Sequence, residues 1–147
     1  HKSGLNPFLL IASAGTTDTG AVDPLKELGE ITQNHNIWYH IDAAYGGFFI
    51  LSDICKKMFS GIEMVDSLAV DPHKGLFLPF GLGAVIVKDR EAVFHSHHYS
   101  ASYLQDAKDS ANIDPADVSP EFTKHFRAFR LWLPLQLHGT EPFVACL

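Results

Sequence analysis

The sequence is poor in cysteine, in positive charge and in long apolar runs, and each shortage argues against a class of protein. Its two cysteines, Cys55 and Cys146, lie far apart without a CxxC pair, which disfavours a disulfide framework and a zinc site. Asp and Glu number 17 against 11 Lys and Arg, and the net charge of −6 disfavours nucleic acid or an anionic membrane as a partner. No apolar run reaches the roughly 18–20 residues of a membrane-spanning helix. Small-molecule chemistry is left open.

The ends of the chain lack the usual start and stop signals. The first residue is His1 rather than Met, residues 1–5 lack the features of a secretory signal, and residues 139–147 have neither a capped helix nor a polar tail. Hydrophobic residues make up 46% of the chain, enough for a real core. We therefore expect an internal piece of a longer, cytoplasmic protein.

Segments typical of strands and helices alternate along the chain. Residues 7–14 predict a buried strand, which a turn-rich loop closes. Asp23 and Pro24 predict the start of a helix, with Asp23 as its cap and Pro24 at its first position. Further strands are expected at residues 37–42, 64–70 and 83–88, with a helix from about residue 47 to residue 60. This alternation predicts an α/β layer.

The last third of the chain is less regular. Residues 96–120 are polar and rich in turn formers, which predicts a long functional loop. Aromatic residues and leucines over residues 122–137 predict a helix, which Pro134 should kink. The histidines of residues 95–98 suit metal chelation, but no carboxylate or cysteine recurs at ligand spacing, so we expect no metal site.

Two short motifs place an acid and an amine at the ends of two expected strands. HIDAAYGG occupies residues 40–47 and SLAVDPHKG occupies residues 67–75, so Asp42 and Lys74 each follow an apolar run. The ends of strands are where α/β sheets carry their chemistry. A lysine that forms a Schiff base, with a carboxylate that keeps a pyridine nitrogen protonated, suits pyridoxal phosphate. A surface lysine and an aspartate that caps a turn are the structural alternatives.

Three ordered motifs resemble those of the group II pyridoxal-phosphate decarboxylases, the family of aromatic-L-amino-acid and glutamate decarboxylases. In that family one strand ends in Gly-Thr-Thr, a later strand ends in His-Ile/Val-Asp-Ala-Ala, and a third leads into Asn/Asp-Pro-His-Lys. Residues 15–17, 40–44 and 71–74 correspond. The resemblance covers all 147 residues. It implies part of the large domain of the aspartate-aminotransferase-like fold, known as fold type I.

The resemblance also implies roles for particular residues. Lys74 would form the Schiff base with pyridoxal phosphate and Asp42 would pair with the pyridine nitrogen. Ala44 would pack its methyl group against the ring, and His73 would be a neighbour of the cofactor. Thr17 falls where the family has a threonine that contacts the cofactor, although a Gly-Thr-Thr turn needs no ligand.

Further positions follow or depart from the family pattern. Tyr103 lies where the family carries a catalytic tyrosine on a mobile loop, and it would protonate the substrate carbon across a dimer interface; an exposed loop aromatic is the alternative. Gly75 stands where aromatic-amino-acid decarboxylases usually have Trp, and Asp71 where the family often has Asn. An acid near a phosphate is unfavourable unless it points away or accepts a hydrogen bond.

The implied function is decarboxylation of an L-amino acid to the amine and CO2 by a homodimeric enzyme. Residues 1–120 would be the central part of the cofactor-binding domain, with a mobile loop at about 96–120, and residues 121–147 a helix toward a C-terminal domain. The isolated chain is expected to be inactive. Two alternatives stay open: another carbon–carbon lyase of the sphingosine-phosphate-lyase kind, and a truncated, non-catalytic relative that associates with a full-length protomer.

Overall fold

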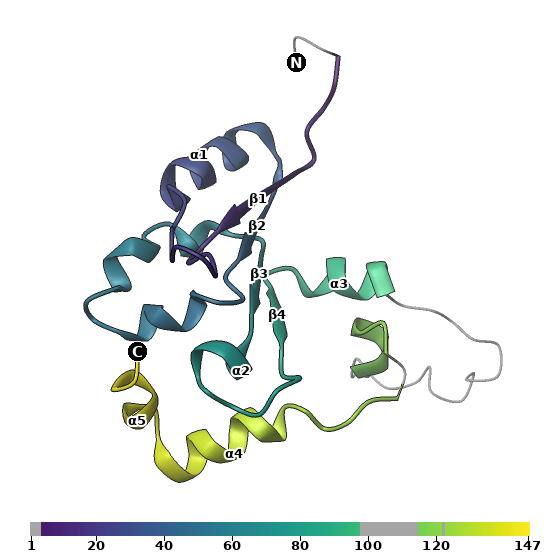
Figure 1. Cartoon of the computed structure of the whole chain (residues 1–147). Helices are drawn as coiled ribbons and strands as arrows, with labels where there is room; N and C mark the ends of the chain where they lie inside the picture. Colours follow the sequence, from purple (N-terminus) through teal and green to yellow (C-terminus); the bar gives the residue numbers. More distant parts are fainter. Residues whose placement is uncertain (1–3, 98–114, 122) are drawn as a thin grey trace, which may run out of the picture. The chain divides into compact units, whose positions relative to one another are not determined.

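The computed structural model describes residues 4–97, 115–121 and 123–147 (Figure 1). The chain divides into two compact units, one formed by the residues up to 88 together with 127–147 and the other by residues 89–126. No helix of the described residues is long and apolar enough to cross a membrane.

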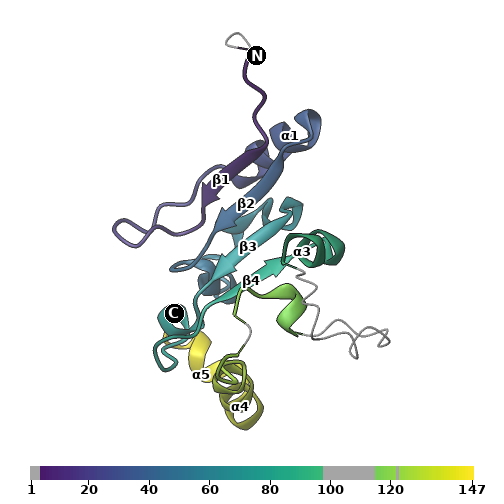
Figure 2. The same cartoon turned by 90° about the vertical axis from the view of Figure 1, so that its right-hand side faces the viewer.

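The first unit contains a four-stranded sheet in the order β1-β2-β3-β4 (Figure 2). Its strands are β1 (Leu9–Ser13), β2 (Trp38–Asp42), β3 (Ser67–Val70) and β4 (Ala84–Val87). The first three strands are parallel and β4 is antiparallel to β3. The expected α/β architecture is therefore confirmed. Because parallel strands end at the same edge of a sheet, the segments that follow β1, β2 and β3 meet there.

Two connections differ from expectation. Helix α1 (Leu25–His35) joins β1 to β2, but Asp23 does not cap it. The Asp23 carboxylate instead accepts a hydrogen bond from the Ser13 backbone N–H at 2.7 Å. Because the Asp23 carboxylate is engaged with the end of β1, it does not serve the first turn of α1. The predicted cap was wrong for that reason.

The segment between β2 and β3 forms three short 3₁₀ turns instead of the single helix expected to residue 60. These turns span Gly47–Leu51, Lys56–Phe59 and Ile62–Met64. The consecutive residues Phe48, Phe49 and Ile50 all pack against the core. A surface helix buries one apolar stripe rather than three neighbours in a row, so the tighter turns suit this sequence better.

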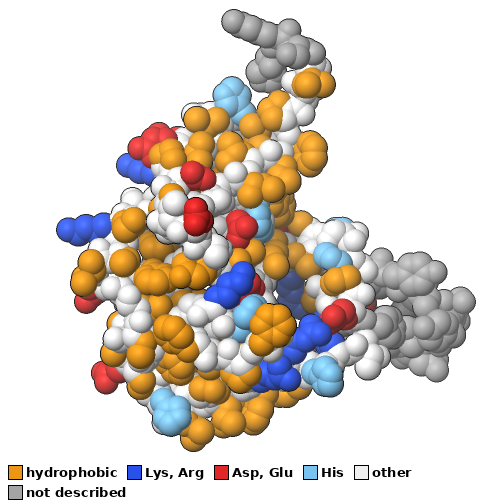
Figure 3. Space-filling model, in the orientation of Figure 1, with side chains coloured by type: hydrophobic (Ala, Val, Ile, Leu, Met, Phe, Trp, Pro, Cys, Tyr) orange, Lys and Arg blue, Asp and Glu red, His pale blue; other side chains and the backbone are white. Residues whose placement is uncertain are grey.

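The core lies mainly on one side of the sheet. Tyr39 and Ile41 are buried, whereas Asp42 is exposed, as the alternation of side chains along a strand requires. Strand β1 was expected to be buried, and this holds only on its core side: Ala12 is buried, whereas Leu9 and Ile11 on the opposite face are 41% and 61% exposed. Large apolar side chains are exposed at many further places (Figure 3).

The C-terminal part of the first unit carries two helices. Helix α4 spans Phe129–His138 and continues through Pro134, and α5 spans Glu141–Val144. The predicted helix therefore begins several residues later than expected. Leu131 and Phe143 pack on a second small core of buried leucines, formed by Leu76, Leu78 and Leu82. This core supports the segment that carries the DPHK motif.

The second unit consists of α3 (Arg90–His97) and a 3₁₀ turn at Pro115–Val118. The Asp89 carboxylate accepts hydrogen bonds from the backbone N–H groups of Glu91 and Ala92 at 2.9 and 3.2 Å, and so caps α3. Much of the predicted loop at 96–120 lies outside the described residues.

Tyr39 predicts an alkaline sensitivity of the fold. Its hydroxyl donates a hydrogen bond to the Leu25 carbonyl at 3.0 Å, which joins β2 to α1. Burial, and then the charge of Asp23, raises the pKa of Tyr39 to about 12. In the unfolded chain the Tyr39 phenol ionises near pH 10. The contribution of Tyr39 to the free energy of unfolding is therefore complete below about pH 10 and is lost as the pH rises toward 12. We expect Tyr39→Phe to lower the free energy of unfolding by about 1 kcal/mol at neutral pH.

The same variant should lose less stability than the wild type above about pH 10, because it has no phenol to ionise. Urea unfolding of the complete protein at several pH values measures both effects. Tyr45→Phe is the matched control, since Tyr45 is 39% exposed. Equal alkaline losses in the Tyr39→Phe variant and the wild type would contradict the prediction.

Candidate functional site

The motifs identified in the sequence meet at the edge where the parallel strands end. The Ala14 N–H donates to the Asp42 carbonyl at 2.9 Å, and the Ala43 N–H donates to the Ala69 carbonyl at 3.0 Å. One step further on, the Asp71 N–H donates to the Ala44 carbonyl at 3.2 Å. These bonds continue the strand pairing beyond the sheet, so the loops after β1, β2 and β3 are fixed relative to one another.

A close approach of two glycines holds the first two loops together. A Cβ atom on Gly46 would lie 2.5 Å from the Gly15 Cα and 2.6 Å from the Ala14 carbonyl oxygen. Gly15 also has a φ of +86°, which L side chains rarely adopt. Neither position therefore has room for a larger residue.

We expect Gly46→Ala to reduce the free energy of unfolding by about 1–3 kcal/mol, because the added methyl group meets backbone atoms that cannot move aside freely. Thermal or urea unfolding of the complete protein measures the loss. Ser60→Ala, at an exposed turn in the same unit, is the control and should change stability little. Unchanged stability in Gly46→Ala would mean that the two loops are not in contact.

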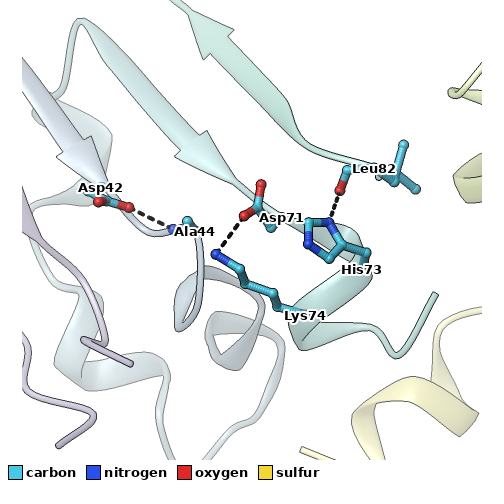
Figure 4. A network of polar contacts seen from close by, with 6 residues as sticks. All are labelled: Asp42, Ala44, Asp71, His73, Lys74 and Leu82. Carbon is cyan, nitrogen blue, oxygen red and sulfur yellow. Dashed lines mark hydrogen bonds and ion pairs between the residues drawn. The ribbon is translucent and has the colours of Figure 1, made fainter. Parts of the chain in front are cut away.

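Asp42 is the last residue of β2 and is exposed at the strand end. Its Oδ1 atom accepts a hydrogen bond from the Ala44 N–H at 3.1 Å (Figure 4). Its other oxygen has no hydrogen-bond partner within the part of the chain that the structure describes. The turn therefore fixes the carboxylate through one oxygen and leaves the other available to a ligand.

Lys74 lies on α2 (Pro72–Gly75), the short helix that follows β3. Its Nζ atom is 2.7 Å from Asp71 Oδ2, and the Lys74 side chain is 38% exposed (Figure 4). The structure thus brings Asp42 and Lys74 to the ends of neighbouring parallel strands, as the motifs predicted. The sequence analysis predicted no role for Asp71. An aspartate three positions before a lysine is nevertheless a spacing that favours an ion pair on a helix.

The other predicted residues surround this pair. The His73 ring donates from Nδ1 to the Leu82 carbonyl at 2.6 Å and packs edge-on against Phe80. Ala44 is half-buried. Thr17 is exposed, and its neighbour Thr16 makes side-chain hydrogen bonds within the same loop. Tyr103 lies outside the described residues, so its predicted role is untested.

Gly75 departs from the family pattern, and its surroundings explain why a glycine stands here. A Cβ atom on Gly75 would lie 2.9 Å from the Phe48 Cβ and 3.2 Å from its Cδ2. Phe48 comes from the 3₁₀ turn after β2 and fills the space that a side chain at position 75 would need.

Comparison with protein families matches the whole chain, residues 1–147, to the pyridoxal-dependent decarboxylase conserved domain. The chain is 43% identical over 134 residues to L-2,4-diaminobutyrate decarboxylase of Acinetobacter baumannii, covering 90% of this chain and 26% of that protein. It is 35% identical over 145 residues to aromatic-L-amino-acid decarboxylase of Bacillus atrophaeus, covering 97% of this chain and 30% of that protein.

Solved structures of similar proteins share the fold. The Oryza sativa TDC, crystallised with PLP and tryptamine, superposes with a TM-score of 0.88 at 27% identity over 98% of this chain and 30% of its own. The mouse CSAD in apo form gives a TM-score of 0.86 at 29% identity, again over 98% of this chain and 30% of its own. The chain therefore has the fold type I arrangement and spans less than a third of the length of these proteins.

Proposed function

The chain belongs to the pyridoxal-dependent decarboxylase family, and from this we propose that the complete protein removes the carboxyl group of an L-amino acid as CO2 and releases the amine. The observation that carries the proposal is the placement of Asp42 and Lys74 at the ends of neighbouring parallel strands. A carboxylate and a primary amine at one sheet edge can serve the two ends of a pyridoxal ring.

The residues present fit pyridoxal phosphate in two respects. The Lys74 side chain is 38% exposed, so an aldehyde can approach it. One oxygen of the Asp42 carboxylate is committed to the Ala44 N–H and the other is available for a protonated ring nitrogen. When bound, pyridoxal phosphate accepts the electron pair of the bond that breaks when CO2 leaves.

Each residue of the site then has a distinct task. Lys74 would hold the cofactor through a covalent bond from its nitrogen to the aldehyde. The Asp42 charge would hold a proton on the ring nitrogen, because an opposite charge within hydrogen-bonding distance favours the charged form of that nitrogen. The Ala44 methyl group would support one face of the ring. Thr17, in the loop after β1, and His73, on α2, would contact the cofactor.

Tyr103 would donate the proton that replaces CO2 on the substrate carbon. The substrate class is an L-amino acid, and the relatives named above act on amino acids of different kinds. We further propose that the complete protein is a homodimeric, cytoplasmic enzyme. Residues 1–120 would belong to its cofactor-binding domain, and residues 121–147 would lead toward a further domain.

Borohydride reduction of the complete native protein tests this function. One pyridoxyl group should be found by mass spectrometry on the peptide that contains Lys74, and the unreduced protein should release CO2 from at least one L-amino acid. Release of an aldehyde without CO2 would identify a different carbon–carbon lyase. A protein with neither a bound cofactor nor CO2 release would be a non-catalytic relative, and the proposed function would be wrong.

A further inference from the structure

Asp71 is engaged in an unusual way for a residue that begins a helix. It occupies the position before the first residue of α2, where aspartate ordinarily accepts hydrogen bonds from backbone N–H groups of the first turn. Here its side chain makes no such bond. Its Oδ2 atom instead lies 2.7 Å from the Lys74 Nζ (Figure 4). The carboxylate therefore stabilises the lysine rather than the helix.

The structure holds this carboxylate in place from several directions. The Asp71 N–H donates to the Ala44 carbonyl at 3.2 Å, and the Asp71 carbonyl accepts from the Lys74 N–H at 2.9 Å. On the other side, a Cβ atom on Gly83 would lie only 2.7 Å from Asp71 Oδ1. The glycine before β4 thus leaves the space that the carboxylate occupies. Asp71 is 23% exposed, so its position is set by packing as well as by charge.

We propose that Asp71 is a positioning residue that holds the Lys74 ammonium at the strand ends while the cofactor is absent, and that Lys74 must leave Asp71 before it can bond to an aldehyde. The holding contact depends only on the ion pair, whereas the release step rests on the function proposed above. The Asp71 carboxylate therefore slows the capture of the cofactor.

The chemistry of capture requires this release. The ammonium first loses one proton to solvent, since an ammonium nitrogen has no free electron pair with which to attack. The resulting amine adds to the aldehyde carbon, and the aldehyde oxygen leaves as water with the two remaining amine hydrogens. An ammonium held by a carboxylate enters this sequence less readily than one that is unpaired.

Acylation of Lys74 in the cofactor-free complete protein tests the holding contact without any need for activity. A small, uncharged acylating reagent is applied in limiting amount at neutral pH, and the labelled peptides are quantified by mass spectrometry. We expect Asp71→Asn to raise the acylation rate of Lys74 about two- to fivefold, the range for a partly exposed ion pair. Lys56 and Lys57 should react at unchanged rates. A Lys74 rate that is equal or lower in Asp71→Asn would overturn the proposal.

Two further variants separate charge and shape. Asp53→Asn removes the same charge from an exposed position of the same unit and should leave the Lys74 rate unchanged. Gly83→Ala keeps the Asp71 charge but displaces its Oδ1 atom, so the Lys74 rate should rise as in Asp71→Asn. If Asp71→Asn does not fold, the acylation rate of Lys74 in Gly83→Ala is the deciding measurement. An unchanged Lys74 rate in Gly83→Ala would then overturn the proposal.

Cofactor capture by the same variants tests the release step. The rate of attachment, trapped with borohydride, is compared for pyridoxal phosphate and for pyridoxal, which lacks the phosphate. We expect Asp71→Asn to accelerate both by a similar factor. Acceleration with pyridoxal phosphate alone would mean that Asp71 merely repels the phosphate, and would overturn the release step. If neither compound attaches to the wild type, the proposed function fails, while the acylation result still decides the holding contact.

Discussion

The Lys74→Ala variant of the complete protein is expected to carry no pyridoxyl group after borohydride reduction and to release CO2 at least about a thousandfold more slowly than the wild type. The structure gives the reason, because Lys74 is the amine that α2 brings to the ends of the parallel strands. Removal of the amine removes the nucleophile and leaves the strand ends unchanged. Mass spectrometry of the reduced protein and a CO2 assay measure the two effects.

A second substitution at the same position separates the charge of the lysine from its nucleophilicity. Lys74→Arg keeps a positive charge beside Asp71, so the ion pair and the fold should persist, but a guanidinium does not form the covalent bond. Lys57→Ala, in the turn Lys56–Phe59, is the control and should retain both the cofactor and the activity. A pyridoxyl group on another lysine, or a nearly normal rate in Lys74→Ala, would refute the assignment.

Much of the sheet could be predicted from the sequence, because buried strands leave a plain signal. The apolar runs predicted four strands, and the ends of β2 and β4 agree with the expected ranges 37–42 and 83–88 to within one residue. Burial was harder to predict, since an apolar run does not reveal which face of its strand the rest of the fold covers. The three 3₁₀ turns were not predicted, because the periodicity of a short run of consecutive apolar residues does not distinguish a buried helix from other buried structure.

The candidate site could be predicted in part for a similar reason. Asp42 and Lys74 stand at strand ends, and the parallel order of the strands converts that sequence position into spatial proximity. The ion pair of Asp71 with Lys74 could not be predicted with the same ease, because an aspartate before a short helix is equally suited to cap it. The space that the ion-paired Asp71 carboxylate occupies is left by Gly83, which lies twelve positions further along the chain. The sequence around Asp71 alone does not show this contact.

Asp42→Asn is expected to keep the cofactor on Lys74 but to release CO2 at least about a hundredfold more slowly, the usual effect of removing one electrostatic stabiliser from an active site. The carboxylate favours a protonated ring nitrogen by its charge, and a neutral amide does not. The protonated ring is what makes the cofactor a strong acceptor of electrons. Borohydride reduction measures retention of the cofactor, and initial rates of CO2 release measure the loss.

The local structure makes this substitution a clean test of charge. The Ala44 N–H donates to Asp42 Oδ1, and the amide oxygen of asparagine can accept the same bond, so the turn after β2 should survive. Unfolding by urea should therefore be nearly unchanged in Asp42→Asn. A large loss of stability would mean that Asp42 serves the fold, and a nearly normal rate of CO2 release would refute its electrostatic role. A retained pyridoxyl group with a slow rate would assign Asp42 to the chemistry and Lys74 to attachment, as two separable functions of neighbouring strand ends.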